Sequence, residues 1–248
     1  MSEGTIRVTV TRQEPGQPPR DETYDVPFDE RTSVLDALDW IKDTVDATLT
    51  FRWSCRSAVC GSCGVMVNGR PVLGCETFVA GYATSGITVG PMSHAAVQRD
   101  LAVDTEDFLA KLRSAFPWML PEPAALAVEG SAGDGGAVDL AALVSTQTLE
   151  QLEAFRTLAQ CIDCMLCYAA CPVLAEVPGF TGPAAIATAQ RWNHDSRDGG
   201  DEQRFEALAD NEEGIWPCIQ NGACTRVCPK GVDPAKAIKD LQRLAMGA

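Results

Sequence analysis

The spacing of the cysteines constrains this chain more than any other feature of its sequence. The 248 residues include 11 cysteines, which fall into three separate groups. The second and third groups repeat one motif, because CIDCMLCYAACP (Cys161 to Pro172) aligns with CIQNGACTRVCP (Cys218 to Pro229), and Asn221 replaces one cysteine. An odd total, in a chain where MSEGTIRVTV gives no sign of a secretory signal, favours metal binding or redox chemistry over a closed set of disulfides.

The first group of cysteines predicts a binuclear iron–sulfur site. Its members are Cys55, Cys60, Cys63 and Cys75. The spacing C-x4-C-x2-C with one later cysteine is the plant-type pattern for a 2Fe–2S cluster, and Gly61 permits the tight turn that such a loop needs. We expect the fourth ligand on a strand that follows the loop. A structural zinc site is the alternative, but it usually has two C-x2-C pairs and this group has one.

The second and third groups predict two further clusters that share ligands. In bacterial two-cluster ferredoxins the motif C-x2-C-x2-C-x3-C-P occurs twice, and the fourth cysteine of each run binds the other cluster. The same crossing here assigns a 4Fe–4S cluster to Cys161, Cys164, Cys167 and Cys228. It leaves three thiols for the other cluster, namely Cys171, Cys218 and Cys224.

The remaining corner of that last cluster falls on Asn221. A side-chain amide is a poor ligand for iron that prefers thiolate, so we predict a 3Fe–4S cluster. Three thiolates carry less negative charge than four, which raises the reduction potential and suits electron exchange with a quinone. The alternative is a degenerate site that holds no cluster or takes a ligand from outside the chain.

Charge and hydropathy exclude several classes of function. The net charge of -14 repels phosphate backbones, so nucleic-acid binding is not expected. No window approaches 18 continuous apolar residues, so we expect no membrane-spanning segment and any link to a membrane must come through a partner. No Gly-rich nucleotide loop and no Ser/His/Asp arrangement is evident, so no catalytic residues and no substrate site are predicted in this chain.

The first hundred residues predict a small β-rich domain. Thr5–Arg12 alternates apolar and polar residues as a strand does, and Glu22–Val26 is its expected hairpin partner. A helix is expected to begin after Ser33 as N-cap, and Asn68-Gly69 predicts a two-residue hairpin. This order of elements is typical of a β-grasp, plant-type ferredoxin domain, for which we take residues 1–103.

The second half of the chain predicts mainly helices. Residues 104–145 are interpreted as a connecting helix followed by a Pro- and Gly-rich linker, and residues 146–248 as an all-α, bacterial-type two-cluster ferredoxin domain. Asp233 is a natural N-cap for the last helix. The expected helices are Leu149–Leu158, Pro183–Trp192, Glu202–Ala209 and Pro234–Met246. The fold class is therefore α+β.

Three cysteine signatures in this order, over nearly the whole chain, resemble the iron–sulfur subunit of the succinate dehydrogenase and fumarate reductase family. The stretches FRWSCRSAVCGSCG, CMLCYAACP, GPAAI and NHDSRDGG are similar to those of the bacterial fumarate reductases. The resemblance implies an electron-transfer subunit of a succinate:quinone or quinol:fumarate oxidoreductase. Electrons would pass between the FAD of a flavoprotein subunit and a quinone, with menaquinone favoured, through the 2Fe–2S, 4Fe–4S and 3Fe–4S clusters.

The resemblance also implies a location and further partners. One or two membrane anchor subunits would hold this chain at the cytoplasmic face of the bacterial plasma membrane and would carry the quinone and, in some members, haem b. Three residues depart from the succinate dehydrogenase pattern near the quinone: Glu176, Ile219 and Gln242 replace tryptophan, histidine and lysine. Two alternatives stay open, a soluble thiol-dependent fumarate reductase-like complex and a zinc-binding interaction module.

Overall fold

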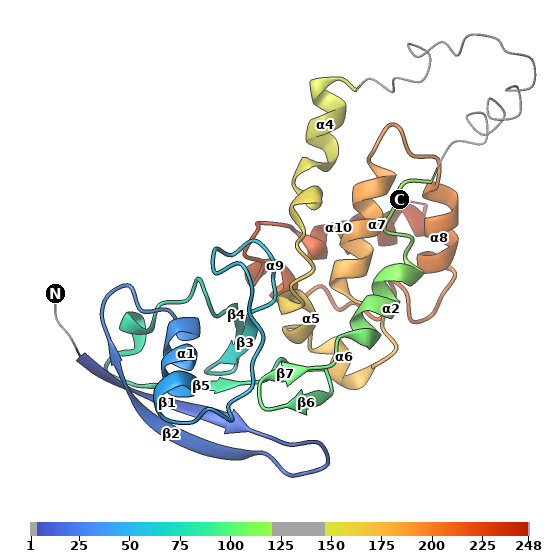
Figure 1. The fold of residues 1–248 in the computed structure, drawn as a ribbon. Helices are drawn as coiled ribbons and strands as arrows, with labels where there is room; N and C mark the ends of the chain where they lie inside the picture. The colour runs from blue at the N-terminus through green and yellow to red at the C-terminus, as the bar shows by residue number, and fades with distance from the viewer. Residues whose placement is uncertain (1–3, 121–146, 248) are drawn as a thin grey trace, which may run out of the picture.

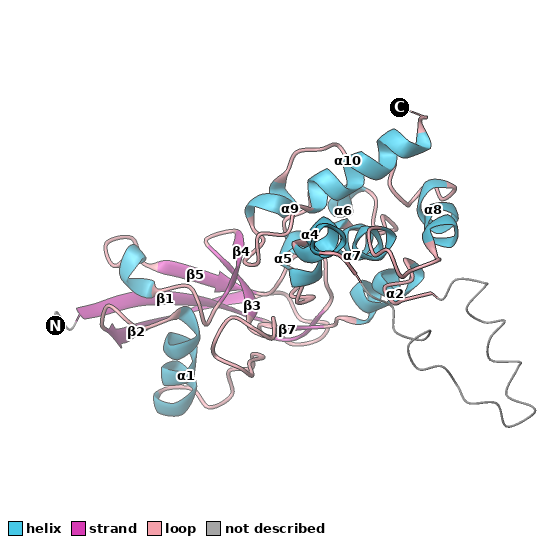
Figure 2. Cartoon of the chain, turned by 90° about the horizontal axis from the view of Figure 1, so that it is seen from above, coloured by secondary structure: helices cyan, strands magenta, loops and turns pink. Residues whose placement is uncertain are grey.

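The chain forms a sheet-containing part followed by a helical part, as Figures 1 and 2 show. A computed structural model describes residues 4–120 and 147–247. The predicted Pro- and Gly-rich linker falls mostly on residues 121–146, which lie outside the described residues. Among the helices of the described ranges, none has both the length and the apolar character that crossing a membrane requires.

A five-stranded mixed sheet organises the first part, in the order β2-β1-β5-β3-β4. β1 pairs antiparallel with β2 and parallel with β5, which places the late strand β5 beside the first strand of the chain. The strands are β1 (Gly4–Arg12), β2 (Arg20–Phe28), β3 (Gly64–Val67), β4 (Arg70–Leu73) and β5 (Ile87–Gly90). This arrangement, with one helix packed on the sheet, confirms the predicted ferredoxin-type domain.

Local sequence signals explain two of these elements. Helix α1 (Val34–Thr44) begins where predicted, because the Ser33 hydroxyl accepts a hydrogen bond from the backbone N–H of Asp36 and the Asp36 carboxylate accepts one from the N–H of Ser33. The turn between β3 and β4 has positive φ at both central residues, 48° at Asn68 and 77° at Gly69. That geometry matches the right-handed twist of the two strands, which is why Asn-Gly is favoured there.

The helical part begins with α2 (Glu106–Ser114), which packs against α7 (Pro183–Asn193). Three predicted helices lie within one residue of their expected bounds, whereas the first ends at Arg156 and continues as a 3-10 turn over Leu158–Gln160. The helices after α2 are α4 (Leu149–Arg156), α5 (Leu166–Ala169), α6 (Val173–Glu176), α7 (Pro183–Asn193), α8 (Asp201–Ala209), α9 (Ala223–Arg226) and α10 (Pro234–Ala245). Asp233 caps α10 as predicted.

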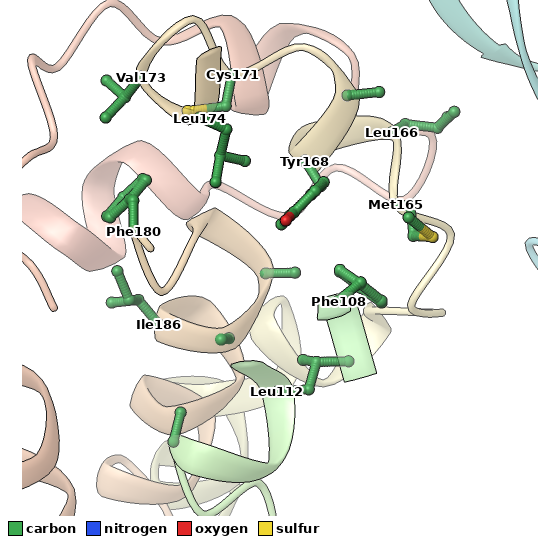
Figure 3. Close-up of a cluster of buried hydrophobic side chains, with 14 of the residues drawn as sticks. Phe108, Leu112, Met165, Leu166, Tyr168, Cys171, Val173, Leu174, Phe180 and Ile186 are labelled. Atoms are coloured by element: carbon green, nitrogen blue, oxygen red, sulfur yellow. The ribbon is translucent and has the colours of Figure 1, made fainter. Parts of the chain in front are cut away.

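A buried apolar cluster joins the helices and extends to the sheet. Phe108 of α2 lies beside Tyr168 of α5, as Figure 3 shows, with their ring centroids 5.5 Å apart, and both are at most 4% exposed. The same cluster includes Leu35 of α1 and Met92, which follows β5. The two parts are therefore held together by packing as well as by the chain, and the short strands β6 (Val97–Arg99) and β7 (Ala102–Val103) lie between them.

Candidate metal centres

The first cysteine group is brought together in two pairs at one end of the sheet. Cys63 Sγ lies 3.3 Å from Cys75 Sγ. In the other pair the backbone N–H of Cys60 donates to Cys55 Sγ at 3.3 Å, and the N–H of Cys55 donates to Cys60 Sγ at 3.4 Å. Cys75 follows β4 rather than lying on it, because the strand ends at Leu73. Two thiol pairs are a donor set that fits a binuclear iron centre.

Backbone N–H groups surround the first group of sulfurs. Arg56 and Ala58 have φ values of 55° and 56°, a left-handed conformation that turns successive N–H groups inward. Three backbone N–H groups donate to Cys55 Sγ. The pKa of the Cys55 thiol is lowered to about 6, and the N–H groups of Ser57 and Val59 are the largest causes. Burial has the opposite effect on Cys63, whose pKa is raised to about 12.

The second predicted set lines one small cavity. Its thiols come from two distant segments, and they are Cys161, Cys164, Cys167 and Cys228. Burial raises the pKa of Cys161 to about 12 and that of Cys167 well above its usual range. Buried thiols of this kind become thiolates when a metal replaces their protons, so four of them around one cavity fit a sulfur-ligated cluster.

The third predicted set lines a separate cavity, and Asn221 lines it too. The thiols are Cys171, Cys218 and Cys224. Burial raises the pKa of Cys224 to about 11, which again requires a metal to hold the thiolate form. The Asn221 side-chain oxygen accepts a hydrogen bond from the backbone N–H of Ala223 at 3.0 Å. The Asn221 oxygen therefore forms a hydrogen bond within its own loop.

The internal repeat of the sequence is also a repeat of backbone conformation. Asp163 and Gln220 occupy equivalent positions and have φ values of 51° and 58°. Two residues later, Met165 and Gly222 have φ values of 64° and 70°, and each is the N-cap residue directly before a short helix, α5 or α9. The sequence gives no signal for these left-handed residues, because three of the four are not glycine.

A set of exposed apolar residues near the third cavity was also missed. Ile219 lines that cavity and is 67% exposed, and Trp216 is 44% exposed. Gln242 donates to the carbonyl of Ile215 at 2.8 Å, which ties the end of α10 to this segment. We define the exposed apolar patch as Ile219, which lines the cavity, and Trp216, which lies two residues before the lining residue Cys218. Spacing in the sequence could not reveal it, because exposure depends on how α10 packs.

The donor sets differ from those of a single-ion site. In the described part of the chain, no three His, Cys, Asp or Glu side chains converge on the position of one metal ion. A cluster requires thiolates that surround a core and do not meet at one point, because each thiolate binds a different iron. The cavity lined by four thiols and the cavity lined by three have this arrangement.

Two protein-family models match the chain and define its class. Residues 7–110 match the 2Fe-2S iron-sulfur cluster binding domain, and residues 157–232 match the 4Fe-4S dicluster domain. The first match covers the sheet and the first cysteine group, and the second covers both copies of the repeated motif. The chain is therefore an iron–sulfur protein built from a 2Fe–2S domain and a mostly helical dicluster domain.

Comparison with whole proteins narrows this class to a family. The chain is 45% identical to a fumarate reductase iron-sulfur subunit of Mycobacterium tuberculosis, over 96% of this chain and 91% of that protein. It is 43% identical to that of Haemophilus influenzae, over 94% and 90%. A chain of the Mycobacterium smegmatis Sdh1 complex shares the fold, with a TM-score of 0.83, 23% identity, and coverage of 99% of this chain and 97% of that one.

This chain belongs to the family of fumarate reductase and succinate dehydrogenase iron–sulfur subunits. A rice mitochondrial succinate dehydrogenase iron-sulfur subunit is 36% identical over 85% of this chain and 64% of that protein, which agrees with the closer likeness to fumarate reductases. The predicted fold class and the predicted role in electron transfer within an oxidoreductase are confirmed. The assignment of each cysteine to a cluster stays a prediction.

Proposed function

We propose that the chain carries electrons through three centres in the order 2Fe–2S, 4Fe–4S, 3Fe–4S. The 2Fe–2S ligands are Cys55, Cys60, Cys63 and Cys75. The 4Fe–4S ligands are Cys161, Cys164, Cys167 and Cys228, and the 3Fe–4S ligands are Cys171, Cys218 and Cys224. One observation carries this proposal: each of the two cavities in the helical part is lined by thiols from both copies of the repeat. When bound, the clusters supply one-electron transfer.

The residues of the chain hold and tune these centres. Backbone N–H groups at Cys55 stabilise its thiolate, so this loop favours the ligated form of the sulfur. Cys167 packs against the buried apolar cluster that joins the helices to the sheet, and Cys224 is 8% exposed, so both thiols have limited contact with water. The side chain of Asn221 cannot supply a thiolate at the third centre, which supports a three-iron core.

The two ends of this relay face different partners in the proposal. The first centre receives or delivers electrons at the FAD of a flavoprotein subunit, and the exposed Trp53 and Val59 of its loop support a surface for that partner. The exposed apolar patch, beside the third cavity, supports docking on one or two membrane anchors that hold a quinone, with menaquinone favoured and haem b in some assemblies. The chain would then lie at the cytoplasmic face of the membrane. We keep the domain division at residues 103 and 146 as part of this proposal.

Replacing Asn221 with cysteine tests the ligand assignment. In the intact complex, Asn221→Cys should convert the three-iron centre to a cubane with a lower reduction potential, because a fourth thiolate adds negative charge. Asn221→Ala is the control, since it adds no ligand and should keep the three-iron EPR signal of the oxidised protein. An unchanged three-iron signal in Asn221→Cys contradicts the crossing of ligands.

Purification tests the membrane partners separately. Recovery of the chain only with detergent-solubilised anchor subunits supports the proposal. Recovery as a soluble complex with the flavoprotein and without anchors supports a thiol-dependent type of fumarate reductase instead. Colourless protein with zinc and without iron would replace both by a zinc-binding interaction module.

A further inference from the structure

Gly61 is the point at which the loop of the first centre touches the loop of the second. It lies between Cys60 and Cys63, and it has a φ of 74°. A Cβ atom added at Gly61 would lie 2.8 Å from both Cα and Cβ of Cys164 and 3.0 Å from the carbonyl oxygen of Ile162. Non-bonded carbon atoms settle at about 3.5–4.0 Å, so the added atom does not fit.

The contact cannot be relieved by rotating a side chain. Cα of Cys164 and the carbonyl oxygen of Ile162 are backbone atoms, so a methyl group at position 61 must displace one of the two loops. Gly64 lies against the same segment, where its added Cβ would be 3.3 Å from the carbonyl oxygen of Cys164. Gly61 in the first loop and Gly64 at the start of β3 thus allow close approach of the second loop.

A cavity beside this contact gives a displaced loop room to move. It is lined from one side by Cys60, Gly61 and Ser62 and from the other by Asp163, Cys164 and Met165. A chain with a larger residue at position 61 therefore has space in which to fold with the loops further apart. The N–H donors to Cys55 Sγ come from the first loop itself, so a wider gap between the two loops leaves these hydrogen bonds in place.

We propose that Gly61 is a positioning residue that sets the distance between the 2Fe–2S and 4Fe–4S centres. It rests on the proposed ligands, because Cys60 and Cys63 belong to the first centre and Cys164 to the second. In each transfer one electron leaves one centre, which is oxidised, and enters the other, which is reduced. The probability of electron tunnelling falls steeply with distance, so a side chain at this contact slows the step.

Pulsed EPR on the intact complex tests this role without relying on turnover. In Gly61→Ala, the reduced 4Fe–4S centre should enhance the spin relaxation of the reduced 2Fe–2S centre less than it does in the unmodified protein. Freeze-quench measurement should show slower electron transfer between the two centres. The matched control is Gly69→Ala, because Gly69 has a φ of 77° and open space around its added Cβ. It introduces the same backbone strain without the contact, and its relaxation should stay unchanged.

Suppose that Gly61→Ala assembles both centres and that the spin relaxation of its 2Fe–2S centre is enhanced as much as in the unmodified protein. That result would overturn the role of Gly61. If that variant fails to assemble its clusters, Gly64→Ala provides the second test, since Gly64 has no left-handed φ and its contact is milder. A smaller weakening in the same direction is expected there, and none would overturn the inference. A wrong ligand assignment can be told apart from a wrong role for Gly61, because the unmodified complex itself would then lack the EPR signal of the 2Fe–2S or the 4Fe–4S centre.

Discussion

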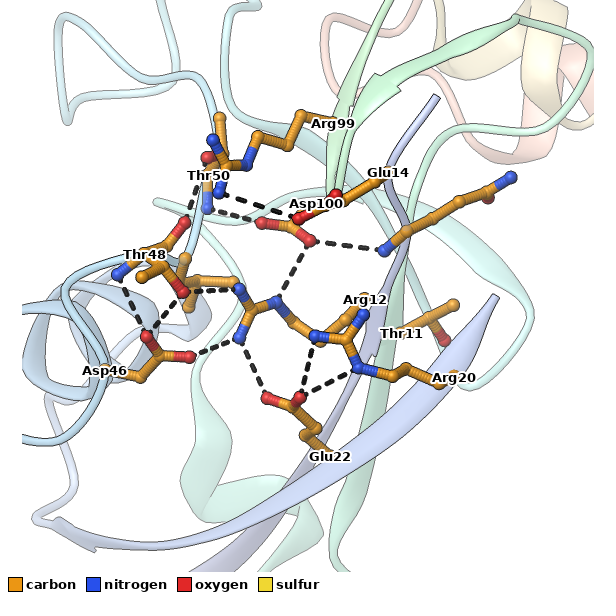
Figure 4. Close-up of polar contacts among 12 residues, drawn as sticks. Thr11, Arg12, Glu14, Arg20, Glu22, Asp46, Thr48, Thr50, Arg99 and Asp100 are labelled. Carbon is orange, nitrogen blue, oxygen red and sulfur yellow. Dashed lines mark hydrogen bonds and ion pairs between the residues drawn. The ribbon is translucent and has the colours of Figure 1, made fainter. Parts of the chain in front are cut away.

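Replacing Arg12 with methionine should destabilise the sheet more than any exposed charge change nearby. Arg12 lies on β1 and is 3% exposed, and its guanidinium contacts three carboxylates, as Figure 4 shows. Nε donates to Asp100 at 3.0 Å, and Nη1 donates to Glu22 at 2.8 Å and to Asp46. Asp100 also accepts the backbone N–H of Thr50, at the start of the segment that leads to the first cysteine loop.

The expected cost follows from which carboxylates can reach water after Arg12→Met. Asp100 is 2% exposed and would be left as a buried charge, whereas Glu22 and Asp46 are 34% and 24% exposed. Removing one partner of a buried ion pair costs about 3–5 kcal/mol. Asp100 keeps the backbone N–H donors of Gln13 and Thr50, so we expect the lower end, about 3 kcal/mol.

Hydrogen exchange under native conditions measures this cost in the holo protein. A loss of about 3 kcal/mol corresponds to roughly a hundredfold faster exchange of amides in β1 and β5 that open with the whole sheet. Arg20→Met is the matched control, because Arg20 is 57% exposed and pairs with the same Glu22. Its expected cost is about 0–1 kcal/mol. If the amides of both variants exchange at similar rates, then loss of the buried Arg12–Asp100 pair does not lower the free energy of unfolding as predicted.

Two further predictions concern the first domain. Cys75→Ala should abolish the 2Fe–2S signal and leave the other two centres, because Cys75 Sγ pairs with Cys63 and reaches neither cavity of the helical part. Iron analysis and EPR check this, and loss of all three centres would contradict it. Burial, together with the hydrogen bond that Tyr24 donates to Glu22, raises the pKa of Tyr24 to about 12. A phenol with a raised pKa stabilises the fold while it is protonated, so the stability advantage over Tyr24→Phe should be full below pH 10 and lost as pH rises from 10 to about 12. An advantage that is the same in urea unfolding at pH 8 and pH 12 would refute the raised pKa.

Elements made by neighbouring residues could be predicted without the fold. The start of α1 follows from the exchange of hydrogen bonds between Ser33 and Asp36, and the β3–β4 turn follows from Asn68-Gly69. Both are local, so a short stretch of sequence contains all the atoms involved. The helix from Leu149 was predicted too long, because helical periodicity continues through Leu158 while the chain tightens into a 3-10 turn before Cys161.

The amino-acid sequence by itself determined the class of the chain, because cysteine spacing is a local property and the replacement at Asn221 is visible in the repeat. It suggested that Cys228 joins the earlier set only through the pattern of two-cluster ferredoxins. Tertiary structure decided which thiols line a common cavity, how far burial raises their pKa values, and that Gly61 meets Cys164. These properties depend on contacts between residues far apart in the chain, and such contacts exist only once the sheet and the helices have packed together.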